Sequence, residues 1–318
     1  QAELTGVVKV EFIGAVSKGL EGKELAEMGD MAEAGVVAFS DDGHYVENAA
    51  FMRRALEYSS MFNKMVIDHA EDITLTKNGH MHEGIVSYEL GVIGRPAVAE
   101  DLAVARDILL SEMTGGHIHI AHVSSKNTVD MVRRAKAKGL NVTCEVTSQH
   151  LSFTDEYLRE YNPAFKMAPP IRSEDHRQAL LEGLKDGTID AIITDHAPHA
   201  YEEKDHEFCC APNGFSGLET SLAAVITNAY GPDKLSIDQV VYYMSTRPAE
   251  LMHLDAGVLE VGKPADITVF STTEKWTVDR NKFYTKGKVS PFDGMTVTGK
   301  AKLTVVDGKI VMKEGVVL

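Results

Sequence analysis

Cysteine is scarce in this sequence, and long apolar runs are missing. The 318 residues include three cysteines, Cys144, Cys209 and Cys210. So odd and sparse a set argues against a disulfide framework and indicates a reducing compartment, the cytoplasm. We interpret the adjacent Cys209 and Cys210 as a loop pair without a metal-binding role. No apolar run approaches the roughly 20 residues of a membrane-spanning helix, so the sequence predicts no membrane segment.

Positive charge is also in short supply. Lysine and arginine number 32 against 47 aspartates and glutamates, which leaves a formal charge of −15. This balance argues against binding to nucleic acid or to an anionic membrane. A small anionic substrate stays compatible with it, because a bound metal and a local arginine outweigh distant surface carboxylates.

Short β-type runs alternate with helical patterns through most of the chain. We expect strands near 7–16, 36–42, 65–69, 117–122, 141–147 and 189–195, and helices near 22–34, 48–62, 98–113, 126–138 and 173–186. This alternation predicts a parallel α/β sheet, and we expect a TIM-like (β/α)8 barrel of the metal-dependent hydrolase type over 1–255.

The two ends of the chain differ from this pattern. The sequence starts at Gln1 without a targeting segment, and only six of the eight strands of a barrel are recognisable. We therefore expect the chain to begin within the fold, at strand three. After residue 255, short strands with glycine turns, including the hairpin signal Asp307-Gly308, predict a small β-sandwich-like domain over 256–318.

Four polar residues stand at the ends of four expected strands: Asp42, His69, His122 and Asp195. Each continues a row of alternate residues that we assign to the inside of the barrel. A single such residue is most simply a turn or capping residue. Four at the same topological position predict a shared site, because barrel enzymes build their chemistry at the carboxyl ends of the strands. An Asp/His/His/Asp set there is typical of a hydrolytic metal centre.

Neighbouring residues compete for some of these roles. Asp41 is an alternative to Asp42, but alternation along the strand favours Asp42. His117 and His119 form a tempting metal-binding pair. Both lie on the opposite face of their strand from His122, so we expect them to point outward, at the helix layer.

Two loops beyond the strands offer further polar groups. His199 follows the last strand in a loop stiffened by a proline, and we expect it to contact substrate, whereas His196 is best explained by a structural hydrogen bond. The glycine-rich segment 213–217 can offer backbone N–H and C=O groups to a polar ring. His80 and His82, in the long 72–97 connection, are equally compatible with solvent exposure and with function.

The motifs around these residues resemble bacterial-type (class I) dihydroorotases of the amidohydrolase superfamily. They are Phe39-Ser40-Asp41-Asp42-Gly43, Asp68-His69-Ala70-Glu71-Asp72, Met81-His82-Glu83-Gly84, Ala121-His122-Val123-Ser124, Lys166-Met167-Ala168-Pro169-Pro170-Ile171-Arg172, Asp195-His196-Ala197-Pro198-His199, Gly217-Leu218-Glu219-Thr220, Gly262-Lys263-Pro264-Ala265-Asp266 and Ser290-Pro291-Phe292-Asp293-Gly294. The resemblance covers essentially the whole chain.

The resemblance implies a zinc-dependent cyclic amide hydrolase of pyrimidine biosynthesis. The expected reaction is the reversible cyclisation of N-carbamoyl-L-aspartate to L-dihydroorotate at two Zn²⁺ ions. Asp42 would bridge the metals, and His69 and His122 would bind the second one. Asp195 would be both a ligand and the catalytic proton shuttle. A carboxylate at position 42 favours dihydroorotase over hydantoinases and allantoinases, which carry a carboxylated lysine there.

The resemblance also assigns substrate binding to His199, Asn213 and Gly214. It fails at two points: the family's strand-one His-x-His pair and substrate arginine are absent, and Ala168 stands where an asparagine is common. We therefore expect these residues alone to be inactive and to bind fewer than two zinc ions. The alternatives are a non-catalytic scaffold for aspartate transcarbamoylase and another cyclic amidohydrolase. A homodimer and a transcarbamoylase partner both stay open.

Overall fold

A six-stranded parallel sheet forms the centre of the molecule. The computed structural model describes residues 1–318, except for the side chain of Glu3. The sheet has the order β1-β2-β3-β6-β7-β8, and every neighbouring pair is parallel. Its strands are β1 (Ile13–Gly14), β2 (Ala38–Ser40), β3 (Val66–Asp68), β6 (Ile118–Ile120), β7 (Val142–Thr147) and β8 (Ala191–Ile193).

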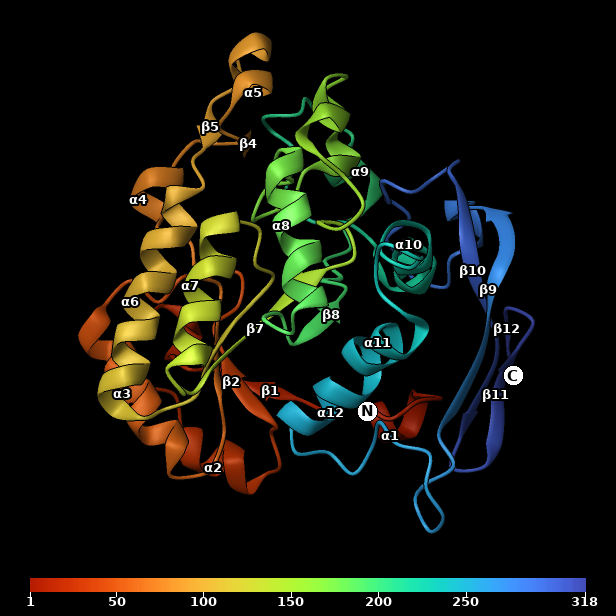
Figure 1. Ribbon diagram of the computed structural model, residues 1–318, viewed down its shortest axis with the longest axis horizontal. Helices are drawn as coiled ribbons and strands as arrows, with labels where there is room; N and C mark the ends of the chain where they lie inside the picture. Colours follow the sequence, from red (N-terminus) through yellow and green to blue (C-terminus); the bar gives the residue numbers. More distant parts are fainter.

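Helices that connect these strands form an outer layer (Figure 1). They are α2 (Met28–Glu33), α3 (Ala49–Ser60), α6 (Val98–Thr114), α7 (Lys126–Ala137) and α8 (Glu174–Lys185). Asn48 caps α3 by accepting a hydrogen bond from the Phe51 N–H, which satisfies one of the free amides at a helix start. The helix predicted over 22–34 is shorter than expected, because backbone bonds from Lys18 to Glu24 and from Ala26 to Val16 hold the first half extended.

The long connections carry short elements. Between β3 and α6 lie α4 (Ile73–Thr76), β4 (Met81–His82), α5 (Ile85–Leu90) and β5 (Gly94–Arg95), and this excursion extends above the sheet in Figure 1. The other short helices are α1 (Ala2–Thr5), α9 (Tyr201–Lys204), α10 (Ser221–Asn228), α11 (Ile237–Val241), α12 (Arg247–Leu251), a π-helical turn at Tyr242–Thr246, and 3-10 turns at Lys18–Leu20, Asp155–Leu158, Pro163–Phe165, Leu218–Thr220 and Arg280–Lys282. Among the described helices, none has the length and apolar character to cross a membrane.

The last part of the chain forms a separate antiparallel sheet. Its strands are β9 (Ile267–Thr277), β10 (Thr296–Val306), β11 (Lys309–Lys313) and β12 (Val316–Val317), in the order β12-β11-β10-β9. Asp307 and Gly308 both have positive φ, 47° and 77°, as the predicted two-residue hairpin between β10 and β11 requires. α10 packs against β10 and joins this sheet to the rest of the molecule (Figure 1).

The two faces of the parallel sheet have different neighbours. Phe39, Val66, Ile118 and Val142 are in register and form one buried core with residues of the covering helices. The next row along, Ser40, Ile67, His119 and Thr143, therefore points to the inside of the curved sheet. Ile67 there belongs to a small second cluster with Ala38, Met65 and Ala121.

The expectation that His117 and His119 face the helices was wrong. In β6 the helix side is taken by Ile118 and Ile120, which join the main core, so both histidines point inward. His119 Nδ1 and His117 Nε2 each lie 2.8 Å from the Thr143 hydroxyl, and His119 Nε2 lies 3.2 Å from Glu145 Oε2. The interior tolerates these polar rings because a neighbouring strand supplies their partners.

Candidate metal centre

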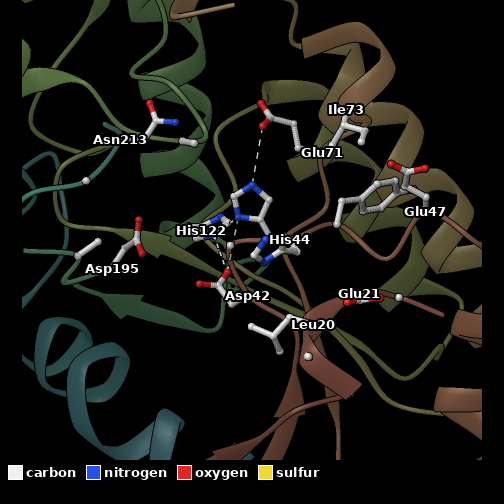
Figure 2. A pocket seen from close by; sticks show the side chains of 18 of the residues that line it. Leu20, Glu21, Asp42, His44, Glu47, Glu71, Ile73, His122, Asp195 and Asn213 are labelled. Carbon is white, nitrogen blue, oxygen red and sulfur yellow. Dashed lines mark hydrogen bonds and ion pairs between the residues drawn. The ribbon is translucent and has the colours of Figure 1, made fainter. Parts of the chain in front are cut away.

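Asp42, His69 and His122 meet at the carboxyl ends of β2, β3 and β6. One ligand atom from each lies within 4.8 Å of the other two. His69 Nδ1 is 3.1 Å from His122 Nε2, and Asp42 Oδ1 is 3.2 Å from His122 Nε2 and 3.6 Å from His69 Nδ1. Figure 2 shows Asp42 and His122 converging on one point of the cavity. Two imidazole nitrogens and a carboxylate oxygen are ligands that Zn²⁺ prefers.

His122 reaches this point through an unusual backbone conformation. Its φ is +35°, in the left-handed region that a side chain disfavours. Ile120, two residues earlier, faces the helices, so a continued strand would turn His122 away from the centre. The left-handed turn redirects the ring into the cavity. Asp195, at the end of β8, has a similar φ of +43°. Such conformations cost about 1–3 kcal/mol each and cluster at functional sites.

A buried ion pair holds the loop that follows His122. The Glu100 carboxylate accepts hydrogen bonds from the amides of Ser124, at 3.0 Å, and Ser125, at 2.9 Å. Arg172 donates through Nε to the Ser124 hydroxyl at 2.7 Å and lies 3.4 Å from Glu100 through Nη2. Glu100 and Arg172 are 1% and 2% exposed. Burial opposes ionisation of Glu100, yet Arg172 and the Ser124 and Ser125 bonds hold the pKa of its carboxyl below its usual range.

The two adjacent aspartates of β2 have different roles. Asp41 is buried and accepts hydrogen bonds from the amides of Val16 and Ser17, both at 2.9 Å, so it ties β1 to β2. Asp42 faces the histidines instead. Burial opposes ionisation of Asp42, but bonding to His122 and His69 lowers the pKa of its carboxyl well below the usual range.

The surroundings of Asp42, His69 and His122 favour positive charge at this site. Burial alone would lower the pKa of His69, but Asp42 and Glu71 raise that pKa to about 9. Asp42 likewise raises the pKa of His122 against burial. The carboxylates of Asp42 and Glu71 therefore draw a proton to the two imidazoles, whose His69 Nδ1 and His122 Nε2 atoms lie 3.1 Å apart. A divalent metal competes for the same nitrogens and releases that proton, so the donor set fits a cation.

Asp195 lies across the cavity from this trio, on the same side as Asn213 (Figure 2). Burial raises the pKa of its carboxyl, an effect that His122 opposes and Asp42 reinforces. The carboxyl therefore holds a proton more readily than an exposed aspartate. A group of this kind, facing a cavity that also contains metal-type ligands, is suited to accepting and returning a proton.

Of the expected substrate-binding residues, two line the cavity and one lies behind them. Asn213, Gly214 and Ala168 line the cavity with Asp42 and Asp195. His199 stands behind them: its Nε2 bonds to the Asn213 carbonyl at 2.7 Å, and its Nδ1 lies 3.3 Å from Glu203. The ring therefore supports the loop in this structure. Gly214 has a φ of +103°, and an added Cβ would lie 2.7 Å from the Ala197 Cβ, so only glycine fits there.

Two other histidines considered in the sequence analysis, His196 and His82, have structural hydrogen-bond partners. His196 Nδ1 accepts from the amides of Gly217 and Leu218, at 3.1 and 3.3 Å, which is the hydrogen-bonding role expected of it. His82 is 7% exposed and lies 3.3 Å from Arg172 Nη1. Burial and the neighbouring Arg172 lower the pKa of His82 to about 3, so it is neutral at physiological pH.

Sequence reasoning missed the charged residues behind the ligands. Glu71, Arg95, Glu100 and Arg172 are buried or nearly so, although charged side chains are mostly exposed. One signal was available: Glu100 lies on the apolar face of α6 together with Ala99, Ala103 and Val104. A carboxylate in such a row indicates a buried partner. Its identity depends on the fold.

Known proteins match the chain over its length. The pattern of the amidohydrolase family matches residues 11–311. The dihydroorotase of Acetivibrio thermocellus is 47% identical over 318 residues, covering 100% of this chain and 75% of the relative. The dihydroorotase of Pelotomaculum thermopropionicum is 48% identical over 314 residues, covering 99% and 74%.

Solved structures agree on the fold. The L-hydantoinase of Arthrobacter aurescens superimposes with a TM-score of 0.85 at 30% identity, over 97% of this chain and 71% of that one. A D-hydantoinase from Thermus superimposes with a TM-score of 0.81 at 22% identity, over 96% and 69%, which speaks for the fold alone. The predicted barrel class is confirmed. The chain therefore belongs to the amidohydrolase family, among its dihydroorotases.

Proposed function

We propose that this protein catalyses the reversible interconversion of N-carbamoyl-L-aspartate and L-dihydroorotate. The observation that carries the proposal is the convergence of Asp42, His69 and His122 in a chain 47% identical to a dihydroorotase over all 318 residues. A scaffold subunit without activity would have no need for these ligands. The sparse, unpaired cysteines among the described residues support a cytoplasmic location.

We assign Asp42, His69 and His122 to a Zn²⁺ site. Bound Zn²⁺ would supply a Lewis acid for the reacting carbonyl and make a water more acidic. In a centre of two ions, Asp42 would be the ligand common to both. Asp195 takes the proton of the attacking water and returns it to the ring nitrogen that leaves, so one carboxylate serves first as base and then as acid.

The Asn213–Gly214 segment can bind the edge of a cyclic amide. The Gly214 N–H already donates to the Lys166 carbonyl at 2.9 Å, and the Asn213 carbonyl accepts from His199. None of the described hydrogen bonds involves the Asn213 N–H or the Gly214 C=O. One donor and one acceptor on adjacent residues complement an imide, which offers an N–H next to a C=O.

Hydantoin hydrolysis is the second candidate, because an L-hydantoinase has the same fold at 30% identity. Against it stands the carboxylate of Asp42 at the end of β2. The test is a substrate series on the zinc-loaded protein, expressed from its complete reading frame: L-dihydroorotate, N-carbamoyl-L-aspartate, hydantoin and allantoin. We expect the highest kcat/KM with the first two and none measurable in Asp42→Ala. A higher kcat/KM for hydantoin would overturn the assignment.

A further inference from the structure

Glu71 lies beside the metal centre without belonging to its ligand set. His69 presents Nδ1 to Asp42 and His122, and its other ring nitrogen, Nε2, lies 3.8 Å from Glu71 Oε2. Figure 2 shows Glu71 on the side of the cavity opposite Asp42. The imidazole therefore stands between two carboxylates, one on each nitrogen.

We infer that Glu71, held by Arg95, is a positioning residue that sets the tautomer and orientation of His69 as a metal ligand. The inference rests on the proposed function. A histidine ligand binds a metal through the lone pair of one nitrogen, so its proton must sit on the other nitrogen. A carboxylate at that second nitrogen stabilises this tautomer and restrains the ring. A small approach of the ring to Glu71 closes the 3.8 Å separation to a hydrogen bond.

The backbone around Glu71 is fixed on both sides. The Glu71 N–H donates to the His69 carbonyl at 2.9 Å, and the Asp72 N–H donates to the Ala99 carbonyl of α6 at 3.0 Å. The Asp72 side chain then caps α4 by accepting from the Thr74 amide at 2.9 Å. Glu71 therefore keeps a constant position relative to His69, as a positioning residue must.

The side chain is held by Arg95 from β5. Arg95 Nη2 lies 3.1 Å from Glu71 Oε2, and the two side chains are 15% and 2% exposed. Burying a carboxylate is unfavourable unless its oxygens find partners. Among the described atoms, Glu71 Oε1 and Arg95 Nε have no hydrogen-bond partner. An ion pair that served stability alone would be expected to satisfy these atoms. Glu71 Oε2 therefore lies between two nitrogen groups, 3.1 Å from Arg95 Nη2 and 3.8 Å from His69 Nε2.

Other roles fit the geometry less well. Glu71 approaches the nitrogen of His69 that faces away from Asp42 and His122, so it is poorly placed to be a fourth ligand to the same ion. Arg95 lines the cavity, but its nearest charged partner is Glu71. Its charge is therefore compensated before any anionic substrate arrives.

The test compares Glu71→Ala and Glu71→Gln with the unmodified protein. Zinc affinity is measured by competition with a chelator, and the His69 tautomer is read from the ¹⁵N shifts of its ring in the zinc-loaded protein. We expect Glu71→Ala to weaken zinc binding by about 10–100-fold and to give mixed tautomers. Glu71→Gln keeps an oxygen acceptor and should recover most of the affinity. Glu83→Gln, an exposed glutamate of the same excursion, is the matched control and should change neither reading.

A second variant tests the inference if Glu71→Ala does not fold. Glu71→Ala leaves Arg95, whose side chain is 15% exposed, without its partner, so Glu71→Ala combined with Arg95→Met removes both charges and should fold. This double variant must still bind zinc more weakly and show mixed His69 tautomers. If zinc affinity stays within two-fold and the tautomer is unchanged, the inference is overturned. If the unmodified protein binds no zinc, the proposed function fails instead.

Discussion

The buried pair of Glu100 and Arg172 offers a sharp test of how the site is supported. Glu100→Gln keeps the shape of the side chain and removes its charge. Glu100 accepts the amides of Ser124 and Ser125 through one oxygen and the Ser124 hydroxyl through the other. In the variant one oxygen can still accept the two amides. The new NH₂ group then faces Arg172, donor against donor.

The expected loss of stability is about 3 kcal/mol. Removing one partner of a buried ion pair typically costs about 3–5 kcal/mol, because the other charge stays buried and uncompensated. We take the lower end because two of the hydrogen bonds of Glu100 survive. Asp101→Asn is the control: Asp101 bonds to Ser125 of the same loop and to Asn127 at the start of α7 but is more exposed, so we expect a loss of about 1 kcal/mol.

The assay is urea unfolding of Glu100→Gln, Arg172→Met and the double variant, with zinc affinity measured on each folded protein. Each single change leaves one buried charge without its partner, whereas the double change removes both charges. The double variant should therefore lose at least about 1 kcal/mol less free energy of unfolding than the two single losses added together. Zinc binding should weaken with Glu100→Gln, since the loop it holds follows His122. A loss below about 1 kcal/mol, or additive losses, would refute the reasoning.

Three further predictions concern other parts of the site. Asp195→Asn should lower kcat for dihydroorotate by about 10²–10⁴-fold and leave zinc bound, as measured by turnover and metal analysis; complete loss of zinc would make Asp195 chiefly a ligand. Burial lowers the pKa of His150 to about 4, so the unfolded chain, with a His pKa of about 6.5, binds the proton first as pH falls. Stability should therefore drop by about 2 kcal/mol from this residue between pH 7 and pH 5, and urea unfolding of His150→Gln should show a correspondingly weaker pH dependence; equal slopes would contradict this. Gly214→Ala should raise KM for dihydroorotate, because the added Cβ would lie 2.7 Å from the Ala197 Cβ and displace the Asn213 loop; an unchanged KM would show that this loop does not contact substrate.

Local patterns in the sequence were enough to place five of the six strands and the ends where side chains gather; the strand expected over 7–16 is present only as β1 (Ile13–Gly14). Alternating strand and helix signals predict a parallel sheet whatever the packing, and parallel strands bring their carboxyl ends to one edge. Asp42, His69 and His122 could therefore be expected together from the sequence alone. The Asp307-Gly308 turn is local in the same sense, since its backbone angles depend on the two residues themselves.

In β6, the face that points inward was decided only by the tertiary structure. Alternation shows that His119 and Ile120 point in opposite directions, but it does not say which direction is the interior. Register with Ile67 and Thr143 settles this for His119. His122 then depends on a left-handed φ of +35°, which no periodicity predicts.

The charged residues behind the ligands also depend on the tertiary structure. Glu71 pairs with Arg95, 24 positions later in the chain. Glu100 pairs with Arg172, which lies 72 positions later, after β6 and β7. A sequence shows that such residues are charged, and composition predicts that they are exposed. Burial becomes tolerable only when the fold brings opposite charges and backbone amides to the same place. The positions of the metal ligands thus follow from where the strands end, whereas the charged residues that hold these ligands in place are brought there by long-range packing.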